Sequence, residues 1–341
     1  MINVTIKDIA KKSGVSIATV SRVLNNNGYA SAEIKEKVLS VAKELNYQPN
    51  GIARSLKMHR TSTIGIIIPD ISNQYFMKIS KGIEDVLQKS GYILIFVSSD
   101  ENPIKEERTL KVLLENRVQG IVLATSSDND GIIKQIQNAG IPIVLVDRKF
   151  ENKKIPLDLV EEDNVEGAYQ LTKYLIQNGH TRIGVINGSL NVSTGRERYA
   201  GFKKAMQEFG MEEITPLVFD GKFTQADGEE AVARFFTSET KPTAIVSFNN
   251  TMTFGAILQL TKMGIKIPDD VVVASYGETD AAQLLTPSGI VSIKQSPYEM
   301  GVRVGEILLH QLQGKAMKPI HEIFKPILDV SEKSQQKGEE L

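Results

Sequence analysis

The chain of 341 residues contains no cysteine and only four histidines. The absence of cysteine excludes disulfides and thiolate-ligated metals, and it is typical of proteins kept in a reducing compartment. His59, His180, His310 and His321 fall in separate predicted elements, at spacings that do not match a metal site. The sequence therefore predicts no metal centre and no cofactor.

Long apolar runs are also missing. The longest, residues 64–68 and 141–146, have the length of strands and are too short to span a bilayer. The first residues, MINVTIKDIAKK, lack the apolar segment and cleavage site of a signal peptide. We therefore expect a cytoplasmic globular protein that does not bind membranes.

The fingerprint motifs of common enzymes are absent as well. The sequence contains no GxGxxG, P-loop, HExxH or GxSxG pattern. Ser40 and Lys43 have the spacing of a nucleophile motif, but they fall on a small predicted helix without a pocket. No catalytic residue is predicted, and a doubly wound enzyme remains an alternative only through carboxylates that face a cleft.

The charge is unevenly distributed. Residues 1–60 contain ten Lys or Arg and four Asp or Glu, a balance of +6, whereas the rest of the chain has a balance of −7. A basic end on an acidic body favours a nucleic-acid-binding arm. The alternative is the solvated basic face of a small helical domain.

The basic end is predicted to form three short helices. Thr5 caps the first, Ser16 the second and Ser31 the third, and Gly14 ends the first with a tight turn. A helix, a glycine turn and a second helix form the helix-turn-helix layout, whose second helix enters the major groove of DNA. The alternative is a plain three-helix bundle.

The second helix begins with residues suited to base and phosphate contacts. Its hydroxyl groups can bond to phosphates or base edges, its small apolar residues can meet thymine methyl groups, and Arg22 can pair bidentately with guanine. These positions are Ser16, Ile17, Ala18, Thr19, Ser21 and Arg22.

After residue 62 the pattern changes to buried runs that alternate with amphipathic helices. The predicted strands are residues 64–69, 92–98, 120–125, 141–147, 182–187, 217–219, 244–248, 271–276 and 290–294. The predicted helices include residues 75–89, 105–115, 165–177, 196–209, 226–236, 252–263 and 297–312. This alternation predicts parallel sheets covered on both faces, and the series is long enough for two doubly wound lobes.

The stretch TIKDIAKKSGVSIATVSRVLNNN, followed by VLSVAKELNYQPNGIARSL, resembles the DNA-binding end of the LacI/GalR family of bacterial transcription regulators. The resemblance covers nearly the whole chain, because the body is similar to the periplasmic sugar-binding fold that this family shares. It implies a small all-α helix-turn-helix domain followed by a two-lobed α/β periplasmic-binding-protein-like domain. It also implies a homodimer on a near-palindromic operator, and the C-terminus has no leucine heptads that would indicate a tetramer.

The resemblance sets the expected boundaries. They are a helix-turn-helix domain over residues 1–48, a hinge helix and linker over 49–61, an effector-binding and dimerisation domain over 62–330 and a disordered tail over 331–341. We assign residues 62–160 and 290–320 to the N-lobe and residues 161–289 and 321–330 to the C-lobe.

The hinge helix is short and marginal in water, and in this family it folds only on operator DNA. Leu56 matches the apolar wedge that enters the minor groove, and Ala53 lets two such helices approach closely. Arg54, Lys57 and Arg60 would hold phosphates, which makes binding salt-dependent. The expected DNA-binding residues are Thr5, Ser16, Ile17, Ala18, Thr19, Ser21, Arg22, Asn25, Tyr47, Asn50, Ala53, Arg54, Leu56 and Lys57.

Polar and aromatic residues follow the predicted strands of the body. Amides can bond to sugar hydroxyls, aromatic faces can pack on a sugar ring, and Asp147 beside Arg148 places an acceptor next to a fork of donors. Most of them match ribose-binding positions of related proteins. The expected effector-binding residues are Asn73, Tyr75, Phe76, Asp147, Arg148, Arg196, Asn249, Tyr276, Glu278 and Gln295.

Two departures from that pattern concern charge. Sugar-binding members usually have aspartate where this chain has Gly277, and Asn250 stands where aspartate is common. We expect Arg148 and Arg196 to be less compensated as a result, which leads to the hypothesis of an acidic effector such as a sugar acid or phosphosugar.

The sequence thus predicts a repressor of carbohydrate-utilisation genes that responds to a small sugar, sugar-acid or phosphosugar effector. One alternative is control by a phosphoprotein or a nucleotide. Another, from a different class, is a sugar-binding transport component, which would be expected to have a signal peptide and no basic arm.

Overall fold

The computed structural model describes residues 4–24, 29–47, 62–152, 154–280, 282, 290–315 and 318–330. The chain divides into two compact units, Met1–Thr61 and Ser62–Leu341. The predicted hinge helix and the predicted tail lie outside the described residues. No helix in the described ranges is long and apolar enough to cross a membrane.

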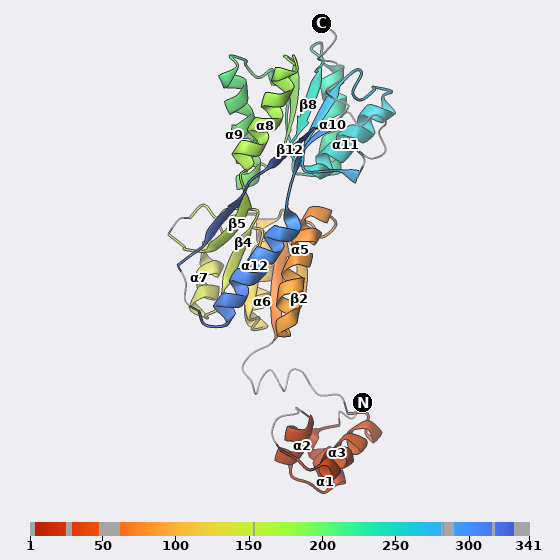
Figure 1. Cartoon of the computed structure of the whole chain (residues 1–341), viewed down its shortest axis with the longest axis vertical. Coiled ribbons are helices and arrows are strands. Elements are labelled where there is room, and N and C mark those ends of the chain that lie inside the picture. Colours follow the sequence, from red (N-terminus) through yellow and green to blue (C-terminus); the bar gives the residue numbers. More distant parts are fainter. Residues whose placement is uncertain are drawn as a thin grey trace. The chain divides into compact units, whose positions relative to one another are not determined.

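The N-terminal unit contains three helices (Figure 1), which are α1 (Ile6–Ser13), α2 (Ile17–Leu24) and α3 (Ala32–Glu44). Helix α1 starts where the backbone N–H and Oγ1 of Thr5 donate to the Asp8 carboxylate, at 2.8 and 2.7 Å. It ends at Gly14, whose φ of 67° is the left-handed conformation that glycine adopts without strain. The predicted caps and the glycine turn are therefore present.

The larger unit contains two lobes, each built on one six-stranded sheet in the described part of the chain. The N-lobe sheet has the order β11-β5-β4-β3-β1-β2 and is parallel throughout. Its strands are β1 (Thr63–Ile68), β2 (Ile93–Ser98), β3 (Gly120–Leu123), β4 (Ile143–Val146), β5 (Asp158–Glu162) and β11 (His321–Phe324).

The C-lobe sheet has the order β12-β10-β9-β8-β6-β7, and only its edge strand β12 runs antiparallel to its neighbour. Its strands are β6 (Ile183–Asn187), β7 (Val218–Asp220), β8 (Ala244–Ser247), β9 (Val272–Tyr276), β10 (Ile290–Lys294) and β12 (Ile327–Val330). Two such lobes confirm the predicted fold class.

Helices cover both faces of each sheet (Figure 1). Buried aliphatic side chains join α5 and α12 to one face of the N-lobe sheet and α6 and α7 to the other. In the C-lobe, α8 and α9 cover one face, and α10 and α11 cover the other. The helices are α5 (Gln74–Leu87), α6 (Pro103–Glu115), α7 (Asp130–Asn138), α8 (Asn164–Gln177), α9 (Ser193–Glu208), α10 (Gln225–Thr237), α11 (Asn250–Lys262) and α12 (Pro297–Leu312), with short 3-10 turns at Gln88–Ser90 and Thr215–Leu217.

The expected lobe assignment is wrong at three strands. Residues 161–162 belong to β5 in the N-lobe sheet, and β10 belongs to the C-lobe sheet. Strand β11 pairs with β5 in the N-lobe, so that only β12 of the last two strands lies in the C-lobe. The sequence failed here because β11 and β12 are half-exposed edge strands and β5 contains three acidic residues, so none of them forms an apolar run.

The three segments that cross between the lobes contact one another. The Glu162 carboxylate, at the end of β5, accepts from Nε2 of Gln295 at 2.6 Å, just after β10. The backbone N–H of Asp163 donates to the carbonyl oxygen of Phe324 at 3.0 Å, at the end of β11. A movement of one lobe against the other would therefore change the contacts among these crossing segments, including the hydrogen bond between Gln295 and Glu162.

Helices α5 and α12 approach closely through glycine. A Cβ atom at Gly301 would lie 2.0 Å from the carbonyl oxygen of Ile79, and one at Gly82 would lie 2.2 Å from that of Tyr298. No side chain fits there without separating the helices. Because Gly301 approaches Ile79 and Gly82 while Gly305 approaches Val86, the contacts advance in the same direction along both helices, which therefore run parallel.

Candidate functional site

The outward face of α2 carries the residues predicted to read DNA. Val20 and Val23 are buried against α1 and α3, whereas Ile17, Ala18 and Arg22 are exposed. An isoleucine exposed at the start of this short helix and an arginine exposed in its last turn offer apolar and bidentate contacts to base edges.

The other predicted DNA contacts fall into two groups. Thr5 and Ser16 act as helix caps, Thr19 and Ser21 are half-buried on α2, and Tyr47 packs against the core of the small unit. The remaining positions lie outside the described residues, and they are Asn25, Asn50, Ala53, Arg54, Leu56 and Lys57.

A cavity of about 930 Å³ lies between the two lobes. It is lined by side chains that follow strands of both sheets, as ligand sites in α/β proteins commonly are. Eight of the ten predicted effector residues line it, namely Asn73, Tyr75, Phe76, Asp147, Arg148, Asn249, Tyr276 and Gln295. The sequence pattern at the strand ends thus predicted eight of the residues that line this cavity, although most of the lining was not predicted.

Arg148 and Asp147 occupy the N-lobe wall of the cavity. Both are buried, and Nε of Arg148 lies 3.7 Å from Oδ2 of Asp147. The guanidinium also makes two hydrogen bonds to Glu101, at 2.7 and 2.5 Å. The expectation that Arg148 lacks a compensating carboxylate is therefore wrong.

Aromatic rings line the cavity on both sides. The hydroxyl of Tyr75 donates to Oδ1 of Asp147 at 2.9 Å, and its ring meets Phe76 edge to face. From the C-lobe, the ring of Phe223 lies 5.4 Å from the guanidinium carbon of Arg148. Flat apolar rings beside hydrogen-bonding groups suit the two kinds of surface that a sugar presents.

Arg196 does not line the cavity, contrary to the prediction. Its side chain is 40% exposed and pairs with Glu151. Helix α9 begins at Ser193 instead of residue 196, and the two arginines are separated by about 200° around the helix axis, since each residue turns it by about 100°. The inward arginine is Arg198, which is 5% exposed.

Arg198 was missed by sequence reasoning, although a signal was present. It falls in register with buried Thr194, Gly201 and Phe202, which is the helical spacing of an inward face. In the structure Nε of Arg198 donates to Asn164 at 2.8 Å and Nη1 donates to the Phe248 carbonyl at 2.7 Å.

The cavity floor contains a buried group of ionisable side chains. The guanidinium carbon of Arg198 lies 3.9 Å from the ring centroid of Tyr276. Burial raises the pKa of Glu162 to about 7, partly offset by the hydrogen bond from Gln295 and by the charge of Arg198. Burial likewise raises the pKa of Asp147, while Arg198 and Arg148 lower it. The charge of Arg198 thus favours the ionised form of both buried carboxylates, against the effect of burial.

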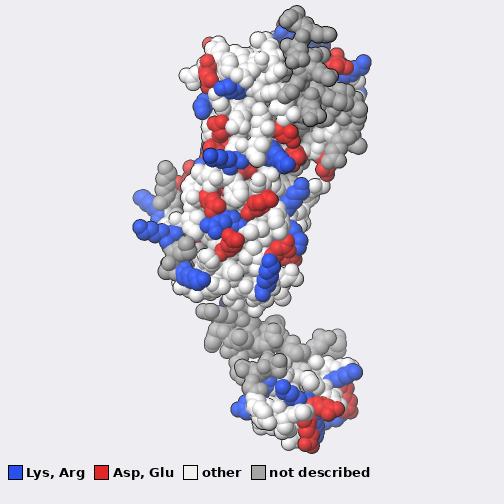
Figure 2. Space-filling view, in the orientation of Figure 1, with Lys and Arg blue, Asp and Glu red and all other residues white. Residues whose placement is uncertain are grey.

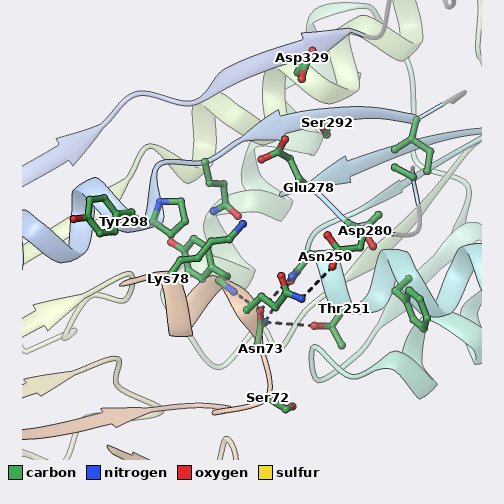
Figure 3. Close-up of a pocket in the computed structure, with 18 of the residues that line it drawn as sticks. Ser72, Asn73, Lys78, Asn250, Thr251, Glu278, Asp280, Ser292, Tyr298 and Asp329 are labelled. Atoms are coloured by element: carbon green, nitrogen blue, oxygen red, sulfur yellow. Dashed lines mark hydrogen bonds between the residues drawn. The ribbon is translucent and has the colours of Figure 1, made fainter. Parts of the chain in front are cut away.

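A second cavity of about 590 Å³ adjoins the first (Figure 3). Asn73, at the start of α5, reaches across to Asn250 and Thr251 of α11, at 3.2 and 3.4 Å. Glu278 lines this second cavity and not the larger one, which corrects its predicted place. The amide contact of Asn73 with Asn250 lies where the two cavities meet.

The backbone at position 277 explains why glycine stands there in place of aspartate. Its φ is 93°, and a Cβ atom there would lie 2.6 Å from Oε1 of Gln295. An aspartate in this backbone would be strained and would displace Gln295. The hydroxyl of Ser275 donates to the Gly277 carbonyl at 2.6 Å, which fixes the turn.

Both rims of the cleft carry contacts between the lobes. On one rim the ammonium of Lys149 bridges Glu161 and Glu197, at 3.2 and 2.7 Å. On the other, Gln74 donates to Asp280 at 3.1 Å. The lobes are therefore linked by polar contacts that a change in their separation would break.

Charge of both signs is interspersed over the visible face of the larger unit (Figure 2). Within the described ranges, no group of three or more histidine, aspartate or glutamate side chains is placed to hold a metal ion. The larger unit thus contains a cleft with hydrogen-bonding walls, and the small unit exposes the α2 residues predicted to read DNA.

Comparisons with known proteins agree with this arrangement. Residues 5–50 match the family described as "Bacterial regulatory proteins, lacI family". Residues 61–316 match the family described as "Periplasmic binding proteins and sugar binding domain of LacI family".

The chain is also similar to individual proteins over most of its length. It is 34% identical over 313 residues to the HTH-type transcriptional repressor PurR of Pasteurella multocida (strain Pm70), covering 92% of this chain and 93% of the relative. The lac repressor dimer bound to operator and the anti-inducer ONPF gives a TM-score of 0.80 at 25% identity, covering 96% of this chain and 98% of that one. The CelR–cellobiose complex gives 0.71 at 27% identity, with the same coverage.

Proposed function

Because the chain belongs to the LacI family and is a DNA-binding transcriptional repressor, we propose that a small sugar-like effector in the cleft cavity sets its affinity for the operator. The alternatives of an enzyme and of a transport component are wrong, since the relatives that match most of the chain are repressors. The repressor acts in the cytoplasm, and its targets are carbohydrate-utilisation genes.

The observation that carries this proposal is the composition of the larger cavity. Two aromatic side chains, Tyr75 and Phe223, stand beside acceptor and donor groups from both lobes, such as Asp147 and Asn249. A polyol offers an apolar ring face and many hydroxyls that both donate and accept, so it matches this lining. The solved relative in complex with cellobiose supports a sugar as the ligand class.

The effector acts through the separation of the lobes. A ligand that binds one arrangement of the lobes more tightly shifts the population toward it, by an amount equal to its differential affinity. The contacts at the rims and the hydrogen bond between Glu162 and Gln295 are the elements that such a shift would change. Inducer and corepressor differ only in which arrangement the ligand prefers.

We further propose that the active species is a homodimer on a near-palindromic operator. Strand β2 lies at the edge of the N-lobe sheet, with Ile93, Ile95 and Phe96 exposed by 67%, 44% and 37%. An apolar edge strand of this kind promotes association unless a partner covers it. A second copy of the chain supplies that cover, and it places a second recognition helix on the matching half-site.

A nucleotide effector is the second candidate, which the resemblance to repressors named PurR favours. Its base would stack between the aromatic rings, and its phosphate would need a cationic partner in the cavity. Control by a phosphoprotein has no comparable feature in its favour.

The effector class is tested by thermal melting of the full chain with D-ribose, D-glucose, cellobiose, D-gluconate, ribose 5-phosphate and AMP. A compound that binds only the folded protein raises Tm by mass action. We expect a neutral sugar to raise Tm and to change operator affinity in a fluorescence anisotropy titration, with two chains bound per operator. A rise with AMP alone would favour the nucleotide candidate, and four chains per operator would contradict the dimer.

Arg22 on the exposed face of α2 offers a test of base recognition. Replacing Arg22 by alanine is expected to weaken operator binding by about 1–3 kcal/mol and to relax the preference at one base pair. The measurement is anisotropy with an operator selected from random DNA and with its single-base variants. If the variant keeps the wild-type order among these DNAs, Arg22 does not read a base.

A further inference from the structure

We propose that Glu101 determines the specificity of the cleft cavity. By filling the guanidinium fork of Arg148, it makes the cavity select a neutral polyhydroxylated ligand over the corresponding acid or phosphate. This inference rests on the proposed function, because it takes a small polyol as the effector class. It replaces the hypothesis of an acidic effector.

The fork of Arg148 is occupied by the protein itself. Its side chain is 3% exposed, Nη1 donates to Oε2 of Glu101 at 2.7 Å and Nη2 donates to Oε1 at 2.5 Å. Two parallel N–H···O bonds are the arrangement with which arginine binds carboxylates and phosphates. A ligand anion would therefore have to displace Glu101, whereas a hydroxyl group would not.

The Nε donor of Arg148 has no partner in the protein and remains for a ligand. Its Nε is buried and has no hydrogen-bond partner, although Oδ2 of Asp147 lies 3.7 Å away. A buried donor left unpaired is unfavourable unless a ligand or water supplies an acceptor. A sugar hydroxyl can accept from this N–H and donate to Asp147, whereas a carboxylate or fully ionised phosphate group has no proton to donate.

The backbone that carries Glu101 is held in an uncommon conformation. Asp100 and Glu101 have φ values of 54° and 53°, a region that residues other than glycine rarely adopt. Asp147 and Phe223, with φ values of 67° and 65°, also line the cavity. Such conformations gather where the surroundings impose a functional geometry. The loop is thus shaped to deliver the Glu101 carboxylate to Arg148.

The charge of the lining does not favour an anion either. Among the described residues that line the cavity, four are acidic and three are cationic. The acidic ones are Asp70, Asp100, Glu101 and Asp147, and the cationic ones are Arg148, Arg198 and Lys222. The charge of Arg198 acts on the buried carboxylates of Asp147 and Glu162, so it too has compensating partners. Glu101 thus supplies a carboxylate to the cavity, whereas position 277, where related proteins usually have aspartate, supplies none.

The test is isothermal titration of the full chain with two matched series, D-glucose with D-gluconate and glucose 6-phosphate, and D-ribose with ribose 5-phosphate. We expect the wild type to bind the neutral sugar of a series about tenfold more tightly than its anions. In Glu101→Gln the neutral amide leaves the Arg148 charge uncompensated, and this ratio should fall by about tenfold or reverse. Glu151→Gln makes the same change in the Glu151–Arg196 pair outside the cavity and should keep the wild-type ratio.

The ratio of the wild-type affinities for a neutral sugar and for its anions tests the proposal without any substitution. Anions that bind the wild type as tightly as their neutral sugars would overturn the assignment of Glu101 while leaving a sugar-like effector in place. A Glu101→Gln ratio equal to that of Glu151→Gln, with Tm showing both variants folded, would overturn it as well. Failure of every compound to bind any of the three proteins would contradict the proposed effector class, and this assignment with it.

Discussion

Replacing Arg198 by methionine is expected to lower the free energy of unfolding by about 3–5 kcal/mol near pH 8 and to abolish the response to effector. Methionine fills a similar volume but leaves Asp147 and Glu162 as buried carboxylates without their shared cation. It also removes the donors to Asn164 and to the Phe248 carbonyl, both of which are buried. Urea denaturation gives the free energy, and thermal melting with the sugar panel gives the response.

The loss of stability in this variant should depend on pH. Arg198 lowers the pKa of both carboxylates, so these pKa values rise further when it is removed. The destabilisation should therefore shrink as the pH falls and the carboxylates take up protons, and it should be larger near pH 8 than near pH 5.

Arg196→Met is the matched control, two residues away on α9. Its guanidinium is 40% exposed and pairs with Glu151, so we expect a change within about 1 kcal/mol and an intact effector response. Equal losses in the two variants would show that Arg198 contributes no more than an exposed ion pair.

Glu162→Gln is expected to stabilise the protein at pH 8 by about 3 kcal/mol relative to the wild type, and by close to nothing near pH 4.5. Burial raises the pKa of Glu162 from 4.5 to about 7, so the folded state holds this proton more tightly than the unfolded state does. The contribution of the protonated group to stability is complete below about pH 4.5 and is lost as pH rises through about 7. Glutamine cannot ionise and can still accept the hydrogen bond from Gln295.

The measurement is urea denaturation of both proteins between pH 5 and pH 8, read as the difference between their unfolding free energies. The exposed carboxylate of Glu299 on α12 supplies the control, and Glu299→Gln should run parallel to the wild type. A difference between Glu162→Gln and the wild type that stays constant across this range would contradict a buried, protonated Glu162. The same pH series followed by operator binding would show whether ionisation of Glu162 also affects repression.

Much of the fold is predictable because it depends on local patterns. The caps at Thr5 and Ser16 and the turn at Gly14 follow from short-range backbone chemistry, and they fix the helix-turn-helix unit. The apolar runs that became β1, β3 and β4 are continuous because both faces of a parallel strand are buried. The polar edge strands β11 and β12 have no such run, so their pairing had to come from the structure.

The cleft shows the same division between local and long-range information. The sequence predicted that Asn73 and Asp147 would lie at one edge of the N-lobe sheet and that Asn249 would face them from the C-lobe, because parallel strands end at one edge of each sheet. The prediction chose Arg196 instead of Arg198 because it started α9 at residue 196, although the spacing of Arg198 from Thr194, Gly201 and Phe202 indicates the inward face.

Only the tertiary structure decided the electrostatics of the cleft. Glu101 and Arg148 are 47 residues apart in sequence, and Glu162 and Gln295 are 133 apart, so no local pattern relates the members of either pair. The sequence determined a DNA-reading helix and a two-lobed binding fold, because periodicity and capping act over a few residues. Which carboxylate neutralises which cation was decided by packing, because charge compensation acts through space and is set by the loops that the fold brings together.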